Sequence, residues 1–394
     1  MIFKSIKIKE VLEEVIDNRG KTPPKIDDGI ELIETTSIVG QNKFPNYNKI
    51  SKFVSKETYD NWFRSGHPKK GDILIATVGA NIGNVAIMKR DRGCIAQNLV
   101  ALRVDDNYCT NEYLYYYLSS YKVQYRLKNL DIGSAQPNLK VPHLLNMEIK
   151  LPPINTQNKI TNLLSVFDSK MENNKKMNKT LEEMAQAIYK SWFRDFEPFQ
   201  DEEFVKSELG MIPKGWKVIK LKEIVSLKNG KRPNEKNENP QKNFKVPVIG
   251  ASGVMAYTEE SLYDEPILVV GRVGTLGVVQ RYNSHCWTSD NTIVIKSDFY
   301  EYVYQILKTI NFKSLNRGST QPLIAQKDIK SQKVVFPPKN ILKEFSDIVS
   351  KLFEKVKNNK RENQTLKKLR DSLLPKLMSG EIRVPLEKGK KEVN

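Results

Sequence analysis

The sequence predicts an α+β fold built by tandem duplication: a mixed α/β domain followed by a long helix, present twice. Two pentapeptides, GSAQP (133–137) and GSTQP (318–322), differ at one position and lie 185 residues apart. The same offset places IKLPP (149–153) on VVFPP (334–338). Repetition over such a distance indicates a repeated structural unit rather than two unrelated turns.

The repeat extends through each α/β domain. Its other matched segments are NRGKTPP (18–24) with KNGKRPN (228–234), DILIATVGANIGNVAI (72–87) with PILVVGRVGTLGVVQ (266–280), CIAQNLVAL (94–102) with CWTSDNTIV (286–294), and NEYLYYYL (111–118) with YEYVYQIL (300–307). Apolar runs bounded by Gly and Pro predict strands near 30–39, 72–78, 84–89, 98–104 and 146–151, and near 246–250, 266–270, 277–281, 292–296 and 332–336. One helix is predicted in each copy, near 111–128 and 300–312.

A long helix is predicted after each Pro-Pro pair. Residues 155–196 and 340–377 contain no Gly and no Pro except Pro375. Apolar residues recur in both segments at alternating gaps of four and three, the heptad pattern of a coiled coil. They are Ile160, Leu164, Phe167, Met171, Leu181, Ile188 and Trp192, then Phe345, Val349, Leu352, Val356, Leu366, Leu373 and Leu377. About 40 residues at 1.5 Å each would make a rod of roughly 60 Å. We expect the two helices to form an antiparallel coiled coil with pseudo-twofold symmetry.

Asparagines interrupt both predicted seams. Asn174 and Asn178 fall on seam positions of the first helix, and Asn359 and Asn363 on those of the second. In an antiparallel pair, Asn174 would face Asn363 and Asn178 would face Asn359. Polar seam residues lower stability but select register and orientation, so we predict a registering role. The alternative is a solvated or frayed middle of the pair.

The formal net charge of +18 favours an anionic partner, most often nucleic acid. An unspecialised basic surface is the alternative. No apolar run of about 18 residues predicts a membrane span, and the N-terminus lacks the apolar core of a signal peptide, so we expect a cytoplasmic location. The three cysteines and three histidines lack zinc-type spacing, so no metal site is expected. An odd number of cysteines also favours a reducing compartment.

The usual motifs of nucleic-acid enzymes are missing from the sequence. It has no GxxxxGK[ST] string, no [ND]PP[YF] loop and no PD…ExK arrangement. The Gly-rich GRVGTLG (271–277) runs directly into β-like VVQRY, so it offers no helix N-terminus for a phosphate. The sequence therefore predicts a binding protein without a catalytic site.

Four further strings carry a family resemblance: LPPINTQNKI (151–160), YKSWFRDFEPF (189–199), SELGMIPKGWKVIKL (207–221) and LRDSLLPKLMSGEIRV (369–384). Together with the duplication, they resemble the specificity (S) subunits of type I DNA restriction–modification systems over nearly the whole chain. The first copy departs from the pattern because it lacks the IPxGW lead-in of the second. The repeat and the resemblance give target-recognition domains at 1–153 and 197–338, spacer helices at 154–196 and 339–382, and a basic tail at 383–394.

The resemblance implies a non-catalytic subunit that recognises a DNA sequence. Each target-recognition domain would read one half of a bipartite, asymmetric site, and the paired helices would set the unread gap between the halves. Two methyltransferase subunits and, in some systems, two restriction subunits would be the partners. S-adenosylmethionine, ATP and magnesium would bind those subunits, and no cofactor is expected in this chain. Two alternatives stay open: a divergent nuclease, and a DNA- or RNA-binding scaffold unrelated to modification.

The residues that read DNA are expected where the two copies differ, mainly in 35–70 and 232–263. The candidates of the first domain are Arg19, Lys21, Thr36, Lys43, Asn46, Asn48 and Arg64. Those of the second are Lys228, Lys231, Arg232, Ser252, Tyr257 and Arg272. The polar positions Asn81, Gln136, Asn138, Thr275, Asn291 and Gln321 are expected either to contact DNA or to brace loops.

Two aromatic groups have competing interpretations. Trp192 and Phe193 are candidates for docking a partner subunit. The run Tyr113, Tyr115, Tyr116 and Tyr117 could stack on bases, but packing in a core explains it more simply.

Overall fold

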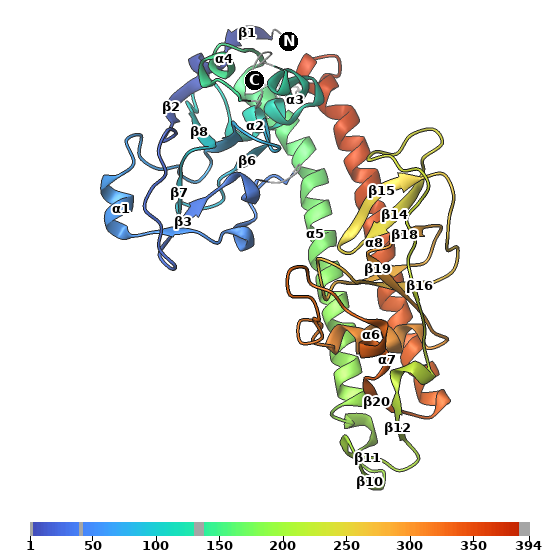
Figure 1. The fold of residues 1–394 in the computed structure, drawn as a ribbon. Helices are drawn as coiled ribbons and strands as arrows, with labels where there is room; N and C mark the ends of the chain where they lie inside the picture. Colours follow the sequence, from blue (N-terminus) through green and yellow to red (C-terminus); the bar gives the residue numbers. More distant parts are fainter. Residues whose placement is uncertain (1–2, 39–41, 130–137, 386–394) are drawn as a thin grey trace, which may run out of the picture. The chain divides into compact units, whose positions relative to one another are not determined.

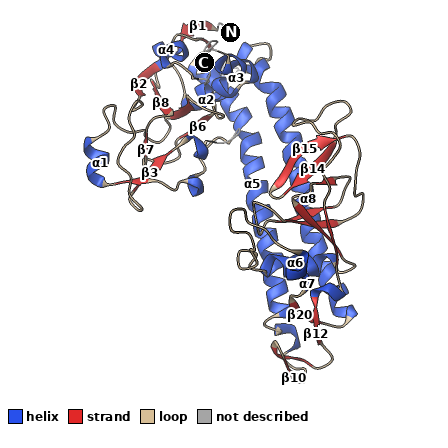
Figure 2. Cartoon of the chain, viewed as in Figure 1, coloured by secondary structure: helices blue, strands red, loops and turns tan. Residues whose placement is uncertain are grey.

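The computed structural model describes residues 3–38, 42–129 and 138–385 (Figure 1). The chain forms two compact units, residues 1–174 with 361–394, and residues 175–360. Each unit contains one α/β domain and one part of each long helix. Figure 2 shows the strands confined to the α/β domains.

The first α/β domain contains two main sheets. A four-stranded antiparallel sheet has the order β2 (Leu12–Ile16), β8 (Leu99–Val104), β5 (Ile73–Ala76), β6 (Val85–Ile87). A three-stranded sheet has the order β4 (Phe53–Val54), β3 (Ile30–Ile33), β7 (Cys94–Ile95), with β3 and β7 parallel. β1 (Lys4–Lys7) pairs with β9 (Glu148–Leu151), the strand that ends at the first Pro-Pro.

The second domain repeats this topology strand for strand. Its four-stranded sheet is β13 (Ser226–Asn229), β19 (Thr292–Lys296), β16 (Ile267–Gly271), β17 (Val279–Tyr282). Its three-stranded sheet is β15 (Gly253–Thr258), β14 (Val246–Gly250), β18 (Trp287–Thr288), and again the last pair is parallel. β12 (Lys217–Lys220) pairs with β20 (Lys333–Phe336). The duplication predicted from sequence is confirmed. The hairpin β10 (Phe204–Ser207)–β11 (Gly210–Pro213) comes from the lead-in that the first copy lacks.

The helix expected over 111–128 is two helices, α2 (Asn111–Ser119) and α3 (Tyr121–Lys128). Ser120 breaks it with an extended backbone (ψ 142°), and its hydroxyl bonds to the carbonyl of Tyr117. α6 (Tyr300–Thr309) is the counterpart of α2. Short helices not predicted from sequence are α1 (Lys56–Asn61), α4 (Val141–Leu145), α7 (Gln326–Lys330), and the 3-10 turns η1 (Ile8–Val11), η2 (Thr35–Ser37), η3 (Tyr47–Lys49), η4 (Glu197–Phe199) and η5 (Leu221–Glu223).

The long helices α5 (Ile154–Phe193) and α8 (Lys339–Ser379) begin directly after the two Pro-Pro pairs. None of the predicted seam residues is exposed. Within the first unit, Asp168 of α5 contacts Arg370 of α8, and Asn174 contacts Asn363. As the chain advances along α5 the partner moves back along α8, so the helices pair antiparallel. Among the described helices, none is both long enough and apolar enough to cross a membrane.

The four seam asparagines make the contacts that the antiparallel arrangement predicts. Asn174 donates to the side-chain oxygen of Asn363 at 2.9 Å and to Glu362 at 2.7 Å. Asn359 donates to Asn178 at 2.9 Å. Asn174, Asn178 and Asn359 are buried, so hydrogen bonding between them offsets the cost of removing the amides from water.

Replacing all four asparagines by Leu is expected to yield a mixture of registers and oligomers with a higher melting temperature, because an all-apolar seam is stable but poorly specified. Light scattering after size exclusion, with thermal unfolding, measures both effects. The matched control is Asn173→Leu with Asn358→Leu, which adds apolar surface to exposed neighbours. A single species of unchanged mass for the fourfold variant would contradict a registering role.

Candidate nucleic-acid interface

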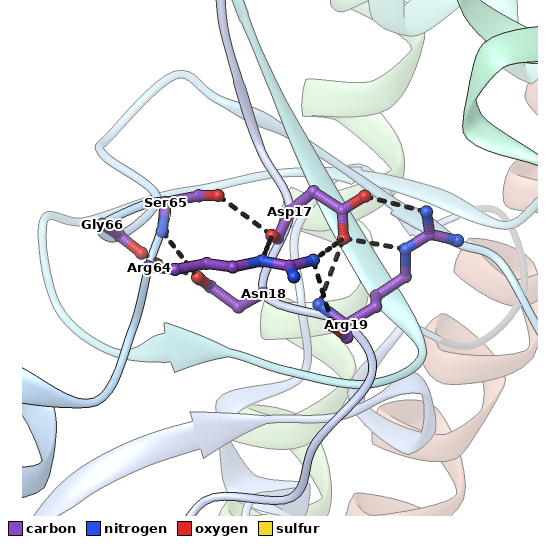
Figure 3. A network of polar contacts seen from close by, with 6 residues as sticks. All are labelled: Asp17, Asn18, Arg19, Arg64, Ser65 and Gly66. Atoms are coloured by element: carbon purple, nitrogen blue, oxygen red, sulfur yellow. Dashed lines mark hydrogen bonds and ion pairs between the residues drawn. The ribbon is translucent and has the colours of Figure 1, made fainter.

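Arg19 and Arg64 of the first domain belong to one polar network (Figure 3). Arg19 forms a two-point ion pair with Asp17, with distances of 2.9 and 2.8 Å. Arg64 donates to the backbone carbonyls of Asp17 and Arg19, each at 3.1 Å. The Arg19 guanidinium lowers the pKa of the Asp17 carboxyl below its usual value, because the hydrogen bond stabilises the charged form.

The buried amide of Asn18 joins two loops in the same network. It donates to the carbonyl of Gly66 and accepts from the backbone N–H of Ser65, both at 2.9 Å. Asp17 and Asn18 were not predicted from sequence, although they directly precede Arg19 and the repeated Gly-Lys string. Arg19 is therefore held against the scaffold, whereas the Arg64 side chain remains 69% exposed and available to an anion.

Loops of the first domain meet at one end of its four-stranded sheet. The backbone N–H of Thr77 donates to Asn98, and that of Leu139 donates to Thr77. Asn81 donates to the carbonyl of Thr35 at 3.2 Å. These bonds bring together the candidates Thr36, Asn81 and Asn138, whereas Gln136 lies outside the described residues. We call residues 35–37, 77–84, 96–98 and 138–139 the first loop surface.

Two other candidates of the first domain have local partners for their side chains. Lys43 lies 3.9 Å from Glu112 and over the ring of Tyr116, and its side chain is largely covered. Asn46 accepts from the backbone N–H of Asn48, which caps η3. These contacts explain the positions of the Lys43 and Asn46 side chains without a contact to DNA. Lys21 is exposed beside the Arg19 network.

The second domain repeats the backbone bonds of the first loop surface. The N–H of Arg272 donates to Asn291 at 2.8 Å, and the N–H of Ile324 donates to Arg272 at 2.9 Å. Arg272 corresponds to Thr77, Asn291 corresponds to Asn98, and Ile324 corresponds to Leu139. The bonds bring together the candidates Arg272, Thr275, Asn291 and Gln321. We call residues 229–232, 250–253, 272–277, 289–291 and 321–324 the second loop surface.

The GSTQP pentapeptide forms a tight corner of this surface. The Asn316 side chain accepts from the N–H groups of Gly318 and Leu323, at 3.0 and 2.9 Å, and so closes the loop. A Cβ atom added to Gly318 would lie 1.8 Å from the carbonyl oxygen of Gln321, so only Gly fits there. Backbone geometry therefore explains the glycine of GSTQP, whereas GSAQP (133–137) lies outside the described residues. Asn316, two residues before GSTQP, was not predicted.

The remaining candidates of the second domain lie in loops and strands. The backbone of Lys231 bonds to Thr288, and Arg232 extends into solvent 3.6 Å from Asp290. Ser252 lies in the turn between β14 and β15, where Gln280 binds the preceding carbonyl of Gly250. Lys228 lies within β13, and Tyr257 lies on β15, where it pairs with Asn237.

The two aromatic groups pack inside the units. Phe193 is 3% exposed and contacts Trp216, Tyr302 and Phe345, while Trp192 packs on Phe345 and Phe199. The expectation that Phe193 docks a partner is corrected, because its ring is used by the core of the second unit. Tyr113, Tyr115, Tyr116 and Tyr117 are buried too, so the simpler core interpretation is confirmed.

Two loop surfaces on duplicated α/β domains, each domain attached to antiparallel helices, define a two-domain binding scaffold. The family described as type I restriction modification DNA specificity domain matches residues 3–183 and 213–368. The chain belongs to this family.

Several relatives are similar over most of their length. The specificity subunit of type I restriction enzyme MjaIX from Methanocaldococcus jannaschii is 34% identical, over 80% of this chain and 78% of that protein. The HindI specificity subunit from Haemophilus influenzae is 23% identical, over 80% and 87%. The crystal structure of the type I S subunit from M. genitalium shares the fold, with a TM-score of 0.52 at 19% identity over 96% of both chains.

Proposed function

We propose that this chain is the DNA sequence-recognition subunit of a type I restriction–modification complex and has no catalytic site of its own. One observation carries the proposal: two domains of a DNA specificity family have identical sheet orders and different loop surfaces. Identical scaffolds with different loops suit two different half-sites, and hence a bipartite, asymmetric target.

Exposed cations and polar loop side chains would make different kinds of contact with DNA. Exposed cations such as Lys21 and Arg64 would contact phosphates, which gives affinity and salt dependence. Polar side chains of the two loop surfaces would contact base edges, and each well-formed pair discriminates by about 1–3 kcal/mol. Asn81, Asn138, Arg272, Thr275, Asn291 and Gln321 remain the proposed members of this second group.

The helices α5 and α8 would set the spacing between half-sites and bind partner subunits. The named relatives are specificity subunits of restriction enzymes, which supports two methyltransferase subunits and, where present, two restriction subunits as partners. S-adenosylmethionine would bind the methyltransferase subunits, and ATP and magnesium the restriction subunits. The cytoplasm, where DNA and these subunits meet, is the expected location.

Expression of the chain with its neighbouring methyltransferase subunit tests the proposal. We expect the two to copurify, and we expect N6-methyladenine in a split motif on both strands of the host DNA. The methyltransferase subunit expressed alone is the control and should leave that motif unmethylated. Preferential binding to RNA, with no methylated motif, would favour the scaffold alternative.

A further inference from the structure

One pair of positions is in contact in both domains but carries different chemistry in each. The first position follows the shared Gly-Lys string and is Thr22 or Arg232. The second precedes the shared asparagine, Asn98 or Asn291, and is Gln97 or Asp290. In the first domain the amide nitrogen of Gln97 donates to the hydroxyl of Thr22. In the second, Arg232 lies 3.6 Å from Asp290. An uncharged pair in one copy is thus replaced by an ion pair in the other.

Part of the framework around this pair is shared by the two copies. Pro23 and Pro233 follow the first position and are both buried. Asn98 and Asn291 follow the second, and each accepts the equivalent backbone bond from Thr77 or Arg272. The shared prolines and the shared asparagine contacts therefore do not by themselves require a different pair of residues in each copy.

Both pairs present side chains to solvent, with Gln97, Arg232 and Asp290 on the loop surfaces and Thr22 beside the first of them. Thr22 and Gln97 are exposed, and the Arg232 side chain is 84% exposed. Gln97 also has a φ of +50°, one of the few non-glycine residues in the described chain with a positive value. Such a conformation is unfavourable for a residue with a Cβ and is often found at functional sites. A glutamine at a position where Gly would be less strained points to a use for its side chain.

We propose, resting on the function proposed above, that these two pairs are matching base-reading sites of different specificity. Gln97 would read adenine in the first half-site, and Arg232, oriented by Asp290, would read guanine in the second. A glutamine amide pairs with N6 and N7 of adenine, and a guanidinium pairs with O6 and N7 of guanine. An amide nitrogen has two donors, so one can remain on Thr22 while the other and the oxygen contact the base.

Binding of the assembled methyltransferase complex to duplexes with single base-pair changes tests the first site. Wild type should prefer A·T at one position of the first half-site by about 5- to 150-fold, which corresponds to 1–3 kcal/mol. Gln97→Ala should reduce that preference to less than about threefold and leave all others unchanged. Gln97→Gly should lose the same base preference as Gln97→Ala. Its melting temperature should be no lower than that of wild type, because Gly tolerates the positive φ. If both variants keep every preference, the assignment is wrong.

Lys21→Ala is the matched control from the adjacent position. Loss of a phosphate contact should weaken binding to all duplexes equally and leave every base preference intact. If Lys21→Ala instead changes the preference at one base pair, the loop that contains Lys21, and not Gln97, determines that base preference.

Exchange of the pair tests whether the two sites correspond. Thr22→Arg with Gln97→Asp should convert the A·T preference of the first half-site to G·C, with the second half-site unchanged. A preference that stays A·T, or that shifts in the second half-site, would overturn the proposal. Failure of the proposed function is a separate outcome, in which the wild-type complex itself prefers no split motif.

Discussion

Replacement of Arg370 by Met is expected to destabilise the first unit by about 3–5 kcal/mol, because it leaves a buried carboxylate without its counter-ion. The Arg370 guanidinium donates to Asp168 at 2.7 Å and to Asp371 at 2.8 Å, and the residue is 7% exposed. The second oxygen of Asp168 accepts from the hydroxyl of Tyr116 at 2.6 Å. Burial and the nearby carboxylate raise the pKa of Tyr116, so the hydroxyl stays a donor.

Urea unfolding of Arg370→Met measures this effect. The double variant Asp168→Asn with Arg370→Met removes both charges and should recover more than half of the loss, because a neutral amide is cheaper to bury than an unpaired carboxylate. Arg361→Met, on the exposed face of the same helix, is the control and should change stability by less than about 0.5 kcal/mol. Equal stability of the Arg370 and Arg361 variants would contradict the buried-pair interpretation.

The parts of the fold that depend on local periodicity could be predicted from the sequence. The seam of α5 and α8 follows from heptad spacing, and the strands β5, β8, β16 and β19 follow from apolar runs between Gly and Pro. Two-residue strands such as β7 and β18 are too short to show a period. The break at Ser120 was missed because the apolar pattern continues across it, and a serine that ends one helix also precedes the next.

The candidate interface could be predicted only in part, because its contacts join loops that are far apart in the sequence. Asn81 and Asn291 were predicted as candidates because they lie within repeated strings, and their contact with DNA stays a prediction. Gln97 and Asp290 were missed, because their chemistry differs between the copies and only the structure shows that each contacts the loop after the Gly-Lys string. Local sequence likewise gave no sign that Lys43 packs on Tyr116.

The two units join their α/β domains to the helices by different contacts. In the first unit the Tyr116 hydroxyl of α2 donates to Asp168 of α5, the partner of Arg370. At the 185-residue offset, Asp168 corresponds to Phe353, and Arg370 corresponds to Ala185. The described second unit therefore has no counterpart of the Asp168–Arg370 pair at these two positions. Instead Arg281, on β17, lies 3.6 Å from the centre of the Phe353 ring. The duplicated halves have thus diverged at the attachment of domain to helix as well as in their loops, which would disfavour packing of either domain on the wrong part of the helices.

Arg281→Met should consequently destabilise the second unit by about 3–5 kcal/mol, since Glu301 would lose its only two-point cation partner among the described contacts. Arg281 donates to both Glu301 oxygens, at 2.5 and 2.6 Å, and both side chains are nearly covered. Its guanidinium also lies 4.7 Å from the centre of the Tyr304 ring, so the variant loses a cation–π contact as well.

The control for Arg281 is Lys214→Met in the same unit, which breaks a pair with Glu203 whose two side chains are 65% and 67% exposed. Exposed pairs contribute only about 0–1 kcal/mol, because water screens the charges and solvates the carboxylate left behind. Urea unfolding should therefore separate the two variants by at least about 2 kcal/mol. Similar losses in both would mean that burial does not govern the Arg281–Glu301 pair. Glu301→Gln combined with Arg281→Met should be more stable than Arg281→Met alone, because the remaining buried group is then neutral and can be hydrogen-bonded at lower cost.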